Sequence, residues 1–193
     1  MSIPRISRRR FVSALPLTVL ATPYSMSALD VGPGGEGPKQ TQPIGFSGPF
    51  TEDEAVAVAA SPMAQEIAGL NGKGYPCSEM ILLAALRRFD LPENHLDAAA
   101  VFGGGAGKRD LCGLLTGGLM AIGFAAGEKN ADRGQVHQVG RAASNAYWDW
   151  WLTRGDLHCM GAGTTHETSE EFVRMCQRAA VKLEDVMLEV VGA

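Results

Sequence analysis

Four cysteines, Cys77, Cys112, Cys159 and Cys176, constrain this 193-residue chain more than any other feature. They follow one another at intervals of 35, 47 and 17 residues, so none of them forms the close spacing of dithiol motifs, haem attachment sites, ferredoxins or zinc ribbons. Any site that they share must therefore be assembled by tertiary packing. Two structural disulfides would be another use of four cysteines in an exported protein.

The first 28 residues have the layout of a twin-arginine signal peptide. Arg8, Arg9 and Arg10 precede Phe11, and an apolar run follows from residue 12 to residue 21. The run is too short to cross a bilayer and Pro16 interrupts it, so we expect no stable membrane span. Export after folding would let a thiol or metal site be assembled in the reducing cytoplasm. We expect a periplasmic or otherwise exported protein.

Residues 29–46 are rich in glycine and proline, which predicts a flexible linker outside the core. Residues 47–193 then have the size of a single domain. The leader holds four of the 17 basic residues and none of the 21 acidic ones, so its removal takes the net charge from −4 to −8. An acidic surface argues against nucleic acid or an anionic membrane as partner.

The domain is predicted to be all-α, a single compact helical bundle, because its apolar residues recur at helical spacing and no run alternates for long like a strand. Thr51 and Glu54 form a capping box, and Ser61 followed by Pro62 begins the next helix. A second capping box, Thr168 with Glu171, opens the last helix. The expected helices span residues 52–60, 62–69, 76–89, 95–102, 111–126, 131–152 and 169–190.

Two cysteines are expected at the beginnings of helices. If Tyr75 and Asp110 are the caps, Cys77 and Cys112 are the second helical residues. Unpaired backbone N–H groups and the helix dipole would favour the thiolate at both positions, and two basic residues precede Asp110. Such thiols suit a reactive dithiol or a metal cluster bound by thiolates.

Glycines at two places predict a close approach of other groups to the backbone. Gly103, Gly104, Gly105 and Gly107 form a run that superficially resembles a phosphate-binding loop, but the spacing of that motif and its preceding strand are missing. We expect this run to let backbone N–H groups approach a bound group, or to form a sharp turn. Two further glycines, four residues apart at positions 113 and 117, would admit a neighbouring helix. These two glycines and the tryptophan-rich segment 147–151 are also compatible with a homodimer interface.

At these residues the chain resembles the C_GCAxxG_C_C family, which is related to the N-terminal part of split-Soret cytochromes. The resemblance covers most of residues 63–190 and is carried by residues 75–79, 102–107 and 112–120, with Cys159 and Cys176 beyond them. It departs from the family label at Cys112, which Leu111 precedes and Gly113 follows. The resemblance implies a helical protein whose cysteines give it redox activity. It also implies a twin-arginine leader, which members of this family often carry.

The sequence thus predicts an exported redox protein whose four cysteines bind one metal centre, an iron–sulfur cluster, for electron transfer to a periplasmic partner. The glycine run would contact the cluster. One alternative is a thiol–disulfide protein in which Cys112 is the low-pKa attacking thiol and Cys77 or another cysteine resolves the intermediate. The other is a non-catalytic module held by two disulfides.

Overall fold

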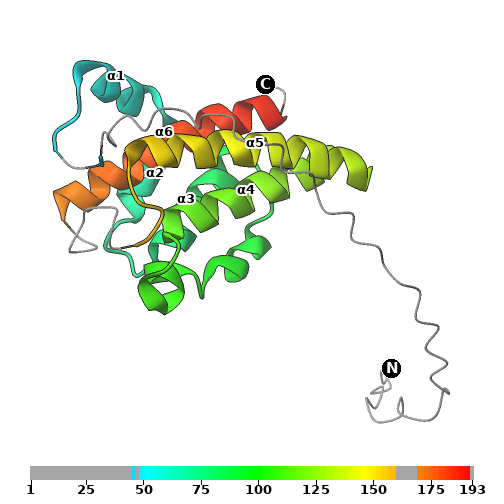
Figure 1. The fold of residues 1–193 in the computed structure, drawn as a ribbon, viewed down its shortest axis with the longest axis horizontal. Helices are drawn as coiled ribbons and strands as arrows, with labels where there is room; N and C mark the ends of the chain where they lie inside the picture. The colour runs from blue at the N-terminus through cyan, green and yellow to red at the C-terminus, as the bar shows by residue number, and fades with distance from the viewer. Residues whose placement is uncertain (1–44, 47, 160–168, 192–193) are drawn as a thin grey trace, which may run out of the picture. The chain divides into compact units, whose positions relative to one another are not determined.

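The computed structural model describes residues 45–46, 48–159 and 169–191, all of which belong to one unit of the chain, residues 39–193. This part of the chain is all-α, as predicted, and its only β-type pairing is an isolated bridge between Leu111 and His158. No helix in it is both long and apolar enough to span a membrane. In chain order the elements are α1 (Glu52–Ala60), α2 (Pro62–Leu70), α3 (Cys77–Arg88), η1 (Glu93–Ala99), η2 (Gly105–Arg109), α4 (Gly113–Lys129), α5 (Arg133–Arg154) and α6 (Glu170–Val191) (Figure 1).

The first two helices begin where their caps predict. The Thr51 hydroxyl accepts a hydrogen bond from the Glu54 N–H at 3.2 Å, and the Glu54 carboxylate accepts one from the Thr51 N–H at 3.1 Å. Ser61 caps α2, and Pro62 is its first residue, where a missing N–H costs no helical hydrogen bond. These contacts satisfy backbone groups that the helix itself leaves unpaired.

The last helix begins one residue later than its predicted cap allows. Thr168 lies outside the described residues, and the Ser169 hydroxyl accepts a hydrogen bond from the Phe172 N–H at 3.1 Å. Ser169 therefore acts as the cap of α6, which begins at Glu170. The predicted cap Thr168 directly precedes Ser169, and both serine and threonine are common helix caps.

Helices α3 and α4 pack closely at the centre of the bundle, and α6 lies against both. A Cβ on Gly117 would lie 2.3 Å from the Ser78 carbonyl oxygen of α3, and a Cβ on Gly118 would lie 2.5 Å from the Tyr147 ring of α5. The predicted close approach at Gly117 is therefore confirmed. Its partner is α3 of the same chain, so a second copy does not fill this position.

Other helix boundaries also differ from the sequence prediction. Pro76, and not Tyr75, caps α3, so Cys77 is its first residue. Cys112, and not Asp110, caps α4, because the Cys112 N–H donates to the Leu157 carbonyl and holds this segment extended. The predicted short helix at 95–102 is the 3₁₀ helix η1, which begins two residues earlier.

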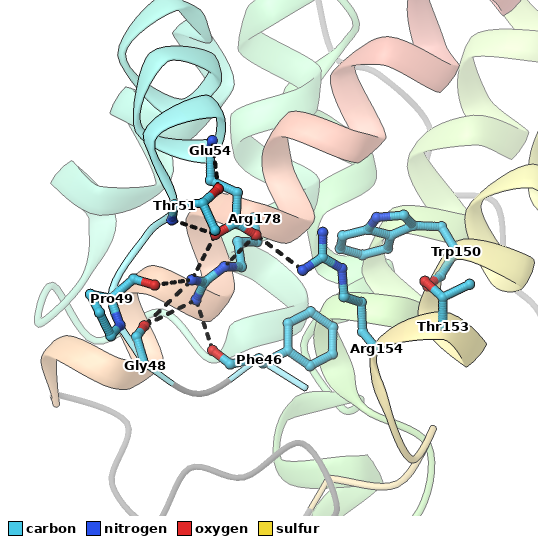
Figure 2. A network of polar contacts seen from close by, with 9 residues as sticks. All are labelled: Phe46, Gly48, Pro49, Thr51, Glu54, Trp150, Thr153, Arg154 and Arg178. Carbon is cyan, nitrogen blue, oxygen red and sulfur yellow. Dashed lines mark hydrogen bonds and ion pairs between the residues drawn. The ribbon is translucent and has the colours of Figure 1, made fainter. Parts of the chain in front are cut away.

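A buried arginine ties the segment before α1 to α6 (Figure 2). The Arg178 guanidinium donates to the Phe46 carbonyl at 2.8 Å and to the Pro49 carbonyl at 2.9 Å, and it pairs with Glu54 at 2.9 Å. Arg154 of α5 pairs with the same carboxylate at 3.0 Å. Three elements are thereby joined through one glutamate.

Phe46, the last residue of the predicted linker, belongs to the hydrophobic core. Its side chain is 2% exposed and its ring centroid lies 4.5 Å from that of Trp151. The expectation that residues 29–46 contribute nothing to the core is therefore wrong at Phe46. Composition did not reveal it because the few apolar residues among glycines and prolines are buried only where the tertiary fold supplies a pocket.

Candidate functional site

Cys77 and Cys112 lie side by side although 35 residues separate them. Cys77 begins α3 and is 5% exposed, and Cys112 caps α4 and is 2% exposed. A Cβ on Gly113 would lie 2.3 Å from the Cys77 Sγ. The Cys77 sulfur therefore occupies the space beside the residue that directly follows Cys112.

Cys159 is held beside Cys112 by backbone pairing. Its N–H donates to the Asp110 carbonyl at 2.9 Å, and the Cys112 N–H donates to the Leu157 carbonyl at 2.8 Å. These two hydrogen bonds flank the bridge between Leu111 and His158. The loop after α5 thus brings a third, partly exposed cysteine to the beginning of α4.

Cys176 of α6 lies in the same region, where Tyr147 is a neighbour of both Cys176 and Cys112. Both side chains are fully buried, and the Tyr147 hydroxyl donates to the Leu114 carbonyl at 3.3 Å. Burial raises the pKa of Tyr147, and the charges of Cys112 and Cys176 raise it further. Tyr147 therefore lies close to both cysteines, which sequence reasoning did not foresee, since aromatic residues on helices usually serve only packing.

The glycine run beside this site forms a left-handed turn. Gly104, Gly105, Ala106 and Gly107 have φ values of 61°, 62°, 54° and 66°, a region that costs residues with a Cβ about 1–2 kcal/mol each. A Cβ on Gly103 would lie 2.4 Å from the Cβ of Pro76, the residue that directly precedes Cys77. The glycines thus allow a tight turn against the start of α3, while contact of Gly103, Gly104, Gly105 and Gly107 with a cofactor stays a prediction.

A surface pocket of about 350 Å³ leads to one of the cysteines. Cys77 lies in its wall with Tyr75, Pro76 and Met80 of the same segment, and Phe172 of α6 closes the other side. Cys77 is therefore the cysteine at which a ligand in this pocket would meet the site.

Comparison with known families agrees with this arrangement. The family model described as "Putative redox-active protein (C_GCAxxG_C_C)" matches residues 75–189. The chain belongs to this family. The matched range contains all four cysteines and the glycine run, so the resemblance seen in the sequence is confirmed. Neither the curated proteins nor the solved structures gave a match.

In this C_GCAxxG_C_C protein, the pKa of the Cys112 thiol contradicts the sequence prediction. Burial raises the pKa of its thiol to about 12, and the charges of Cys77 and Cys159 act in the same direction. The N–H groups of Leu114 and Leu115 at the start of α4 lower it, but by less. The expected low-pKa thiol is wrong for Cys112, because the cost of desolvating a thiolate exceeds the stabilisation by the helix start.

The family's cysteines are chemically suited to a metal centre, since thiolates are the usual ligands of iron–sulfur clusters. Their arrangement fits less well. Within the described parts of the chain, no group of three or more His, Cys, Asp or Glu side chains is placed to hold a metal ion. The metal site predicted at Cys77, Cys112, Cys159 and Cys176 therefore stays a prediction.

Proposed function

We propose that this protein is a thiol-based redox protein in which Cys77 and Cys112 interconvert between a dithiol and a disulfide. The observation that carries the proposal is the contact of the Cys77 sulfur with Gly113, next to Cys112. The pocket beside Cys77 supports it, because its wall contains Cys77 and not Cys112, so a partner that enters the pocket meets Cys77 first.

The two thiols have different roles in this proposal. Cys77 occupies the first position of α3, where the helix dipole favours negative charge, and it attacks a disulfide of the partner. One partner sulfur leaves as a thiol and the other stays bound to Cys77 as a mixed disulfide. The roles that the sequence suggested for Cys112 and Cys77 are thus exchanged.

Cys112 then resolves the mixed disulfide. Once the Cys77 sulfur is in a disulfide it carries no charge, so one of the causes that raise the pKa of Cys112 is removed. The Cys112 thiol loses its proton and attacks the Cys77 sulfur, and the second partner thiol leaves. The partner disulfide gains two electrons and two protons, and the Cys77–Cys112 disulfide is the oxidised product.

The leader in residues 1–28 supports a periplasmic location for this reaction. An exported dithiol protein would exchange electrons with disulfides of other exported proteins or of small thiols. The partner is therefore proposed to be a periplasmic redox protein or disulfide.

Trapping of the intermediate tests the proposal. The Cys112→Ser variant, exposed to oxidised glutathione, should accumulate one mixed disulfide at Cys77, and the wild type should instead form a Cys77–Cys112 disulfide, both identified by peptide mass spectrometry. The Cys77→Ser variant should form neither, and the Cys176→Ser variant should behave like the wild type. A mixed disulfide that forms first at another cysteine would contradict the assignment.

An iron–sulfur cluster for one-electron transfer is the second candidate function. Cys77 and Cys159 lie near Cys112, Cys176 lies with Cys112 near Tyr147, and two backbone N–H groups face the Cys112 sulfur. It ranks second because no three candidate ligands in the described chain are grouped around one point. Iron and sulfide analysis of anaerobically purified protein, with visible absorbance, tests it. A colourless sample without iron would exclude the cluster, and stoichiometric iron that each Cys→Ser change reduces would establish it.

A further inference from the structure

A groove of about 660 Å³ lies between α4 and α5 and has no cysteine in its wall. On the α5 side its residues recur at helical spacing from Arg133 to Trp148, which corresponds to a length of about 22 Å. On the α4 side it is lined by Leu119 and Gly123. The two helices lie beside each other in Figure 1.

One wall of the groove is basic. Arg133, His137 and Arg141 follow one another at four-residue spacing, so they lie along one face of α5. Its lining contains no acidic residue. Among the described residues neither Arg133 nor Arg141 forms an ion pair, whereas Arg154 and Arg178 both pair with Glu54. Two unpaired arginines in a chain with a net charge of −4 are available to an anionic ligand.

Apolar side chains also line the groove, together with the polar Ser144 and Asn145. Leu119, Val136 and Trp148 are partly buried and contribute side-chain surface. A Cβ on Gly123 would meet nothing within 4 Å, and one on Gly140 would approach only the Ala126 Cβ, at 3.6 Å. The groove is therefore open beside an aromatic ring, as in sites that hold the apolar body of a ligand.

From these observations we propose that the α4–α5 groove is a binding site for an organic anion with an aromatic or apolar body. The carboxylate, sulfonate or phosphate group lies against Arg133, His137 and Arg141, because guanidinium groups bind such anions in bidentate fashion. The apolar body lies against Leu119 and Trp148. The groove volume falls within the range of about 300–1,000 Å³ that is usual for small-molecule sites.

Titration of the full-length protein with 8-anilinonaphthalene-1-sulfonate tests the proposal, because this probe carries a sulfonate on an aromatic body. We expect saturable binding at one site, followed by probe fluorescence. The Arg133→Gln/Arg141→Gln variant should bind about tenfold more weakly. The Lys73→Gln/Lys108→Gln variant removes the same charge from outside the groove and should bind like the wild type. Circular dichroism shows whether each variant keeps its fold.

A matched neutral probe separates charge recognition from plain hydrophobic binding. N-phenyl-1-naphthylamine has the same aromatic body without the sulfonate, and the wild type should bind it at least about tenfold more weakly. Equal affinity for both probes would overturn the proposal. So would an undiminished affinity of the Arg133→Gln/Arg141→Gln variant, or the absence of saturable binding because a second copy covers the groove in solution.

Discussion

The Cys77 sulfur lies against Gly113, whose missing side chain leaves the space that the sulfur occupies. A Cβ on Gly113 would come within 2.3 Å of Cys77 Sγ and within 3.1 Å of both the Phe102 carbonyl oxygen and the Ser78 N–H nitrogen. The start of α4 can therefore lie directly on the start of α3. This contact brings together two thiols that the chain order keeps 35 residues apart.

Substitution of Gly113 by alanine should therefore disturb both the packing and the thiol pair. The added methyl group must displace Cys77 or the backbone of α3, and we expect a loss of about 1–3 kcal/mol in the free energy of unfolding. Urea denaturation measures it. Gly127→Ala is the control in the same helix, since a Cβ there meets nothing within 4 Å, and it should be neutral or stabilising by up to about 1 kcal/mol. Equal effects of the two changes would show that Gly113 has no special packing role.

The stability of the protein should fall in alkaline solution because of Cys112. Its thiol has an ordinary pKa of 9.0 and a pKa of about 12 when buried in the fold. Between these values the unfolded chain loses the proton while the folded chain keeps it, so the free energy of unfolding decreases as pH rises. Between pH 8 and pH 10.5 the wild type should lose about 2 kcal/mol more than the Cys112→Ala variant, as measured by urea denaturation. Parallel pH profiles for the two proteins would contradict the assignment.

Arg178 should be among the residues whose loss destabilises the fold most. It is 6% exposed, and its removal takes away the buried ion pair with Glu54 and the donor to the carbonyl groups of Phe46 and Pro49. We expect Arg178→Gln to lower the free energy of unfolding by about 3–5 kcal/mol. The control is Arg174→Gln on the same helix, where an ion pair with the exposed Glu170 is lost and the change should stay below about 1 kcal/mol. A small effect at Arg178 would mean that water replaces its contacts.

The same network predicts a loss of stability in acid. The hydrogen bond from Arg178 is the main reason why the pKa of Glu54 falls from 4.5 to about 2. The unfolded chain therefore takes up a proton at a higher pH than the folded one, and stability that is present above pH 4.5 is lost as pH falls toward 2. Because Glu54 is partly exposed and solvent screens its ion pairs, this loss should reach about 2 kcal/mol at pH 2.5 and be absent from the Glu54→Gln variant. Thermal unfolding from pH 6 to pH 2.5 measures it, with Glu93→Gln as the control because its pair with Arg87 is exposed.

The parts of the fold that follow local rules were predictable from the sequence. Thr51 with Glu54, and Ser61 with Pro62, satisfy helix ends through residues at most three positions away, so a short stretch of sequence contains all the information. The close approach at Gly117 was also predictable, because only glycine permits such contact within a helix. The identity of its partner helix was not.

The sequence by itself determined the all-α character, the first two helix starts and the four cysteines that define the family. Tertiary structure alone decided that Cys112 caps α4, that its thiol is held neutral, and that Phe46 enters the core. The physical reason is that the caps Thr51 and Ser61 depend only on neighbours along the chain, whereas the Cys112 cap depends on a hydrogen bond to a distant segment. Desolvation and the repulsion from Cys77 and Cys159 likewise depend on segments that meet only after folding.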